Sequence, residues 1–150
     1  MIALIQRVAS ASVTVSDERV AETGRGMLAL IGIEKSDTEQ SAQKLAERML
    51  SYRIFSDEKG RMNLDLLASH GELLLVPQFT LVADTEKGRR PGFSKAASPD
   101  QASLLFNYLA QYVEPKVGKL GLGQFGADMQ VALVNDGPVT FWLSSGAEKL

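Results

Sequence analysis

The chain has 150 residues, of which 45% are hydrophobic and 23% are charged, as expected for one globular domain over residues 1–150. Its formal net charge of -2 argues against a general nucleic-acid binder, so any contact with RNA must be local. It contains no cysteine, which excludes disulfides, thiolate nucleophiles and cysteine metal sites.

The first third of the chain predicts strands. Residues 2–5 and 11–15 partly alternate polar and β-branched side chains, as half-buried strands do. A polar turn at 16–19 leads into residues 20–23, the second arm of a hairpin. Residues 27–33 are almost continuously apolar, which indicates a central strand covered on both faces.

A helix is expected next, with Ser36 or Asp37 as its N-cap and its end near Tyr52. Its apolar residues recur at helical spacing: Ala42, Leu45, Ala46, Met49 and Leu50. A buried strand at 72–76 follows and runs on into residues 77–81.

Residues 84–98 are rich in glycine, proline and basic side chains and predict a loop. Ser98 as N-cap and Pro99 at the first helical position then predict a second helix. Two final strands, 129–134 and 139–143, are joined through residues 135–138. The pattern predicts an α+β fold with a mainly antiparallel sheet and two main helices.

Most catalytic arrangements are excluded by residue type. The only histidine, His70, lies beside Gly71 in a predicted turn, and a Ser-His-Asp triad would have to use it. No cluster has metal-ligand spacing, so no metal is expected. Gly121, Gly123 and Gly126 match the dinucleotide fingerprint but precede a strand instead of a helix, so we expect no cofactor.

No apolar run approaches the roughly 20 residues that cross a bilayer, and the first residues do not resemble a secretory signal. We therefore expect a cytoplasmic protein without membrane contact.

Three segments have an ordinary structural interpretation, and two of them also admit a functional one. Residues 135–138 suit a tight hairpin turn, but Pro138 removes a ladder donor, and a cis Gly-Pro bond would aim two carbonyls to one side. Residues 77–81 are typical of a strand end, with Thr80 as one more β-former. Residues 87–91 suit either a solvated loop or a patch that contacts phosphates.

In their order and spacing these segments resemble the D-aminoacyl-tRNA deacylase family along essentially the whole chain. Two signatures carry most of the resemblance: Gln78-Phe79-Thr80-Leu81 and Asn135-Asp136-Gly137-Pro138-Val139-Thr140. The other matching segments are 5–8, 11–15, 53–55, 62–64, 83–85, 87–91 and 125–129.

The resemblance implies a homodimer with a barrel-like core that hydrolyses the ester joining a D-amino acid, or glycine, to tRNA. It implies that Gly137 and Pro138 form a cis pair that reaches into the partner's pocket and rejects L-amino acids. The terminal 2′-hydroxyl of the tRNA would assist attack by water, while N–H groups near Phe79 and Thr80 stabilise the oxyanion.

By the same resemblance the catalytic segment is Gln78, Phe79 and Thr80, where Thr80 is either a nucleophile or a positioning group. Phe125 and Ala102 would line the pocket for the terminal adenosine, and Arg7 would buttress the Gly137-Pro138 pair.

The chain departs from the family pattern at Pro77, where the family usually has serine. Proline lacks both the side-chain hydroxyl and the backbone N–H. The alternative to an active deacylase is therefore a catalytically weakened relative that still binds tRNA.

Overall fold

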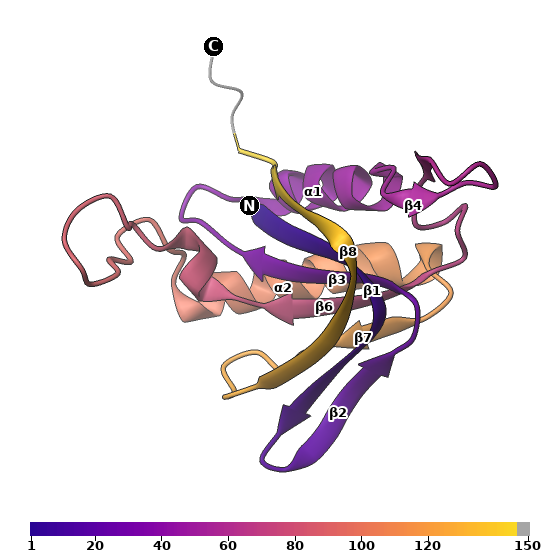
Figure 1. Ribbon diagram of the computed structural model, residues 1–150. Coiled ribbons are helices and arrows are strands. Elements are labelled where there is room, and N and C mark those ends of the chain that lie inside the picture. Colours follow the sequence, from indigo (N-terminus) through magenta and orange to yellow (C-terminus); the bar gives the residue numbers. More distant parts are fainter. Residues whose placement is uncertain (147–150) are drawn as a thin grey trace.

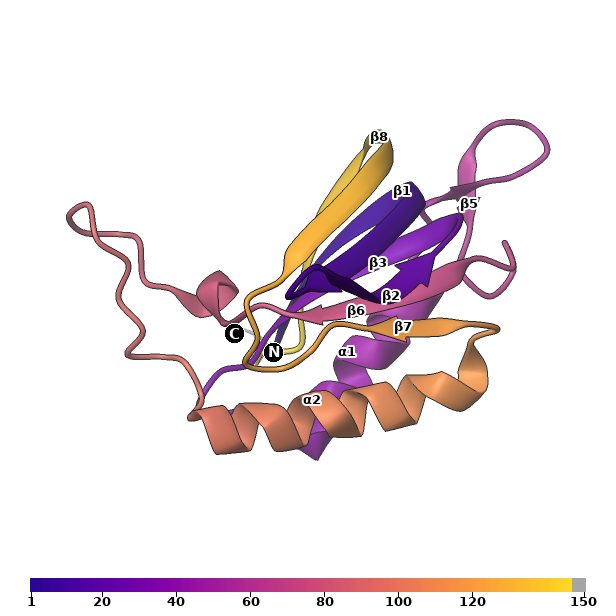
Figure 2. The same ribbon diagram turned by 90° about the horizontal axis from the view of Figure 1, so that it is seen from below.

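The computed structural model describes residues 1–146 as a six-stranded mixed sheet with two helices on one side of it (Figure 1, Figure 2). The sheet contains β1 (Ile2–Val15), β2 (Glu18–Thr23), β3 (Gly26–Gly32), β6 (Glu72–Pro77), β7 (Leu120–Leu122) and β8 (Gln130–Ser144). The helices are α1 (Glu39–Ser51) and α2 (Pro99–Val113), with short 3-10 turns η1 (Phe79–Val82) and η2 (Glu114–Lys116). A separate two-stranded ribbon joins β4 (Phe55–Ser56) to β5 (Met62–Leu64).

The long strand β1 organises the sheet. Its first half pairs with β3 and its second half with β2, while β8 runs antiparallel along its other edge. The predicted antiparallel arrangement is thus confirmed for every strand that pairs with β1. The sheet is mixed, however, because β6 is parallel to both of its partners, β3 and β7, which the sequence did not predict. The reason is connectivity, because α1 and α2 each return the chain to the same end of the sheet before the next strand.

The sheet curls until β7 approaches β2, which gives the expected barrel-like core. A Cβ placed on Gly121 of β7 would lie 3.2 Å from the Thr23 methyl group and 3.5 Å from the Ala21 Cβ. The interior of the curl is filled by one apolar cluster: Val8, Ala11, Val13, Leu28, Leu74 and Val76. The remaining core lies between the sheet and the helices.

Both faces of the central strands are therefore covered. Along β3, Met27, Ala29 and Ile31 join the core under the helices, while Leu28 points into the curl. A strand whose alternate side chains are buried in two different layers has no polar positions. The continuous apolar run at 27–33 was therefore interpreted correctly.

The starts of both helices were predicted to within two residues. Ser98 caps α2 as predicted, accepting a hydrogen bond from the Gln101 N–H, with Pro99 next to it. The prediction for α1 is wrong by one or two residues, because Thr38 is the N-cap and exchanges hydrogen bonds with Ser41. None of the described helices is long and apolar enough to cross a membrane.

The largest correction concerns residues 135–138. They do not form a hairpin turn between two strands, because β8 continues through them from Gln130 to Ser144. Both flanks pair with the same strand, β1. The turn-forming residues interrupt the pairing without reversing the chain.

Candidate active site

A pocket of about 480 Å³ lies where β6 ends, between η1, the start of α2 and the segment that leads into β8. Four of the predicted site residues line it: Gln78, Phe79, Ala102 and Phe125. The sequence reasoning did not assign Ala97, Asp128 and Met129 to the site, although they complete the wall. Asp128 and Met129 belong to the family-matching segment 125–129, which was a signal that could have found them, whereas Ala97 lies in no matching segment.

The Gln78–Thr80 segment reaches the pocket because the buried strand β6 ends directly before it. The Gln78 N–H makes the last sheet bond, 2.8 Å to the Ile31 carbonyl, and the chain then enters η1. The Leu81 N–H closes that turn on the Gln78 carbonyl at 3.2 Å. The expectation of an ordinary strand end through residue 81 is therefore wrong. The turn leaves Phe79 63% exposed and Thr80 exposed.

Thr80 lies beside the pocket but not in its wall. Its hydroxyl accepts a hydrogen bond from the Gln78 side-chain amide, which fixes its orientation. Among the described residues that line the pocket, Asp128 alone is charged. Within residues 1–146, the N–H groups of Phe79 and Thr80 make no hydrogen bond. The segment thus offers hydrogen-bond donors but no general base.

His70 is far from this pocket. It lies in an exposed turn before β6, with φ of 57°, whereas the pocket is at the other end of that strand. Because a strand rises about 3.3 Å per residue, β6 separates the two by roughly 20 Å. A triad through His70 is excluded by this distance. No three His, Asp or Glu side chains of the described chain are grouped as metal ligands.

The remaining predicted residues form a second cluster on the β1–β8 ladder, away from the pocket wall. Gln6 pairs with Thr140 and Val8 pairs with Asn135, so residues 136–139 all lie opposite Arg7. Arg7 holds this bulge by donating from Nε to the Asp136 carbonyl at 2.8 Å. The Nη1 atom of the same guanidinium donates to the Ile54 carbonyl, also at 2.8 Å.

The bulge is closed from inside by Asn135. Its side-chain amide donates to the carbonyls of Arg7 and Val139, at 2.9 and 3.1 Å. The bond between Gly137 and Pro138 is cis, as expected, and both residues are exposed. A Cβ on Gly137 would lie 2.3 Å from Asn135 Oδ1 and 2.5 Å from the Val139 nitrogen. Only glycine fits at position 137 of this bulge.

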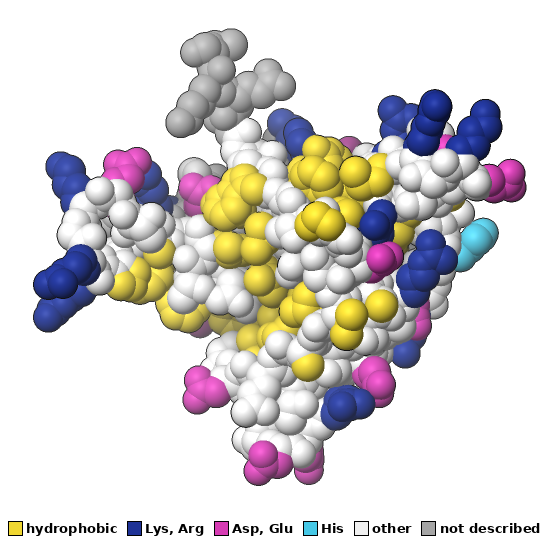
Figure 3. Space-filling view, viewed as in Figure 1, with side chains coloured by type: hydrophobic (Ala, Val, Ile, Leu, Met, Phe, Trp, Pro, Cys, Tyr) yellow, Lys and Arg dark blue, Asp and Glu magenta, His cyan; other side chains and the backbone are white. Residues whose placement is uncertain are grey.

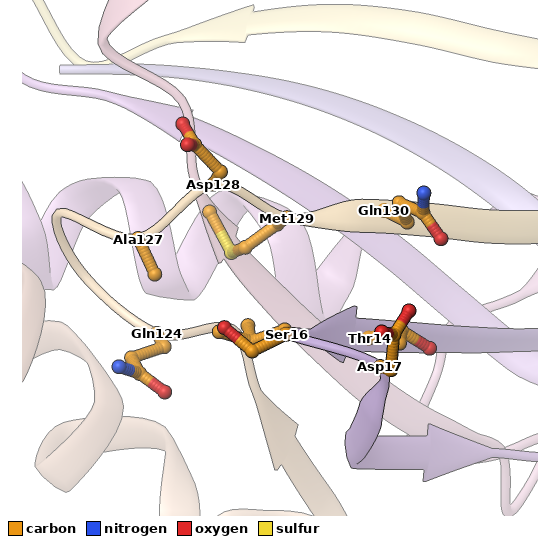
Figure 4. Close-up of a pocket in the computed structure, with 9 residues that line it drawn as sticks. Thr14, Ser16, Asp17, Gln124, Ala127, Asp128, Met129 and Gln130 are labelled. Atoms are coloured by element: carbon orange, nitrogen blue, oxygen red, sulfur yellow. The ribbon is translucent and has the colours of Figure 1, made fainter.

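A second hollow, of about 520 Å³, lies between the β1–β2 turn and the segment 124–130 (Figure 4). Asp128 and Met129 belong to the walls of both hollows. In the close-up the Asp128 carboxylate points away from Asp17, so the two acids do not converge on one point. None of the predicted site residues lines this hollow, and we place the site at the end of β6.

A family model and several known proteins match this chain along almost its whole length. The family model for D-Tyr-tRNA(Tyr) deacylase matches residues 4–144. A D-aminoacyl-tRNA deacylase from Enterobacter sp. (strain 638) is 57% identical over 143 residues, which are 95% of this chain and 99% of that protein. The protein of the same name from Escherichia coli (strain K12 / DH10B) is also 57% identical over the same shares of both chains.

Two solved structures share the fold. The c-Myc DNA unwinding element binding protein superposes with a TM-score of 0.94 at 37% identity, over 98% of this chain and 100% of that one. A probable eukaryotic D-amino acid tRNA deacylase superposes with a TM-score of 0.80, over 95% of this chain and 97% of that one. Its identity is 18%, so it supports the fold alone. With a family model and full-length relatives in agreement, the chain belongs to the D-aminoacyl-tRNA deacylase family.

Proposed function

We propose that the chain hydrolyses the ester of D-aminoacyl-tRNA and releases the free D-amino acid and tRNA. The observation that carries the proposal is the Gln78–Thr80 segment at the mouth of an apolar pocket, in a chain 57% identical to proteins named for this activity. We extend the proposal to glycyl-tRNA, because a substrate without a side chain presents nothing to be rejected. The expected cytoplasmic location belongs to the same proposal.

The pocket suits the terminal adenosine of the tRNA. Its volume of about 480 Å³ lies within the range of small-molecule sites. Ala102 on α2 and Phe125 supply flat apolar wall, and the Phe125 ring is supported from behind by Phe106, with centroids 6.5 Å apart. The base would lie between these residues, with the ester directed toward Phe79 and Thr80.

The chemistry we propose relies on placement. Water attacks the ester carbonyl with help from the vicinal 2′-hydroxyl of the tRNA, and the N–H groups of Phe79 and Thr80 donate to the oxyanion that forms. The carbonyl–oxygen bond then breaks, and the ribose oxygen leaves with a proton as a hydroxyl. Gln78 holds the Thr80 side chain, which acts as a positioning group.

We propose that Gly137 and Pro138 of a partner subunit distinguish D-aminoacyl from L-aminoacyl esters. The pair is exposed and lies outside the pocket of its own chain. Arg7 and Asn135 hold it rigidly from beneath. A rigid backbone entering the partner's pocket would occupy the space that an L side chain needs, so the L substrate is rejected by steric exclusion.

The β8 face supports a homodimer. Val134 is 58% exposed and Trp142 is 54% exposed, and both belong to the strand that carries the bulge. Hydrophobic side chains gather along this face of the molecule (Figure 3). Exposed apolar surface around a protruding backbone segment is typical of a protein interface.

Pro77, where the chain departs from the family pattern, belongs to the pocket wall. It is half-buried in the wall, and its Cδ would lie 3.1 Å from a Cβ on Gly123. The ring therefore packs closely against Gly123 and offers the pocket no hydroxyl at this position. The alternative of a weakened, binding-only relative finds no support among the similar proteins, which are named as deacylases.

Wild-type protein should hydrolyse D-tyrosyl-tRNA on the order of 100-fold faster than L-tyrosyl-tRNA, because a steric block of about 3 kcal/mol acts only on the L substrate. Release of labelled tyrosine from each ester measures this ratio. Equal hydrolysis of both esters, or of neither, would contradict the proposed function.

Thr80→Ala should keep turnover within about tenfold of wild type, because the hydroxyl positions and does not attack. A substrate with a 2′-deoxy terminal adenosine should react on the order of 100-fold more slowly with both proteins. Single-turnover rates measure both effects. Loss of all turnover in Thr80→Ala, with the 2′-deoxy ester unaffected, would make Thr80 the nucleophile.

Pro77→Ser should raise kcat/KM for D-tyrosyl-tRNA about fivefold, the value of one added hydrogen bond. Pro77→Ala is the matched control, since it removes the ring and restores the N–H without a hydroxyl. If the wild type binds tRNA without turnover and Pro77→Ser hydrolyses it, the binding-only alternative is correct. No change in Pro77→Ser would show that this position does not contact the substrate.

Mixing two inactive variants tests the cross-subunit arrangement. Gly137→Ala distorts the bulge, and Ala102→Trp fills the pocket, so each homodimer should be inactive. A refolded equal mixture should recover about a quarter of wild-type activity, because half the dimers are mixed and each has one intact site. Gly118→Ala, where a Cβ meets open space, is the control for glycine replacement. Failure of the mixture to recover, with heterodimers present, would place the pair in its own chain's site.

A further inference from the structure

The loop between η1 and α2 leaves the pocket and returns to it. It starts after Phe79–Val82 and ends at Ala96 and Ala97, and pocket-lining residues lie at both of its ends. Reciprocal backbone bonds between Asp84 and Gly92, at 2.7 and 3.1 Å, pinch its stem. Residues 85–91 therefore project beyond the body of the molecule, as Figure 2 shows. We call residues 84–95 the arm.

The arm carries a local positive charge on a slightly acidic protein. Its basic side chains are Lys87, Arg89, Arg90 and Lys95, against the acids Asp84 and Glu86. All four basic residues are exposed, and none makes a side-chain hydrogen bond or ion pair within residues 1–146. Basic side chains gather at this end of the molecule in the space-filling view (Figure 3). Their charge is thus available to a partner.

Two exposed aromatic rings connect the arm to the pocket. Phe93 of the arm is 39% exposed and Phe79 is 63% exposed. Their ring centroids are 5.2 Å apart, tilted by 51°. Phe79 lines the pocket, so Phe93 lies just outside its mouth. Aromatic rings beside a basic track are the elements with which proteins bind single-stranded nucleic acid.

We propose that the arm binds the unpaired nucleotides that precede the terminal nucleoside of the tRNA. Phe93 stacks on a base, and Arg89 and Arg90, with Lys87 and Lys95, contact the backbone phosphates. The inference rests on the proposed function, which puts the terminal nucleoside in the pocket. The chain of the RNA must leave through the pocket mouth, and the arm begins there. An acidic peptide would use the charge but would leave the stacking ring without a partner.

The first experiment compares two substrates of the same ester chemistry: D-tyrosyl-tRNA and D-tyrosyl-adenosine, which lacks phosphates and further bases. Replacing Arg89 and Arg90 together by alanine should lower kcat/KM for the tRNA ester about tenfold more than for the adenosine ester at low salt. The log–log salt slope for tRNA binding should flatten by about 1.5, since two phosphate contacts are lost.

The matched control is the double replacement Lys59→Ala with Arg61→Ala. These basic residues are also exposed, in the turn before β5 at the opposite end of the molecule (Figure 2). Replacing them removes the same charge from the protein and leaves the arm unchanged. This control should change the tRNA ester and the adenosine ester by the same factor. A loss on tRNA as large as that of the arm variant would show a general charge effect and overturn the proposal.

The second experiment isolates the stacking. Phe93→Leu should weaken binding of uncharged tRNA on the order of tenfold, and should have no effect on tRNA from which the unpaired 3′ nucleotides have been removed. An equal effect on both RNAs, or none on either, would overturn the assigned role of Phe93. Because binding is measured without turnover, these results stand even if the wild type hydrolyses neither ester. That outcome would contradict the proposed function and leave the arm to be judged by binding alone.

Discussion

The pairing of β8 with β1, interrupted by a wide bulge opposite Arg7, is the constraint on which the rest of the structure depends. β8 follows β1 from Gln130 to Ser144, and the ladder opens widely opposite Arg7, with one further register shift between Val8 and Ser10. Because the flanks on both sides of the bulge pair with β1, the extra residues can only protrude. Arg7 and Asn135 occupy the hydrogen-bonding groups that the opening exposes. A short segment without side-chain chemistry thereby becomes a rigid surface feature.

The pocket depends on a second interruption, where β6 stops between two buried layers. Val76 still packs inside the curl, and three residues later the chain enters η1 with Phe79 exposed to solvent. The buried strand fixes the position of the turn, and within residues 1–146 the N–H groups of Phe79 and Thr80 make no hydrogen bond. The pocket wall and the bulge lie on different parts of one chain. This separation explains why a second subunit enters the proposed mechanism.

Much of the fold could be predicted because local patterns and long-range packing agree. The apolar run at 27–33, the α2 cap at Ser98 and the two helices all follow from side-chain periodicity and end signals. The parallel neighbours of β6 could not be predicted in this way, since pairing direction depends on which end of the sheet a crossover helix returns to. Residues such as Ala97 and Met129 became pocket wall only through the packing of distant segments.

The sequence by itself determined which chemical groups are available: one histidine, no cysteine, and two short signatures that identify the family. Tertiary structure alone decided what the second signature does. Asn135, Gly137 and Pro138 are turn formers by local preference, and a tight hairpin was the reasonable expectation. Pairing of both flanks with the single strand β1 overrides that preference, because reversing the chain would break the ladder on one side. The same residues therefore form a bulge whose backbone faces outward.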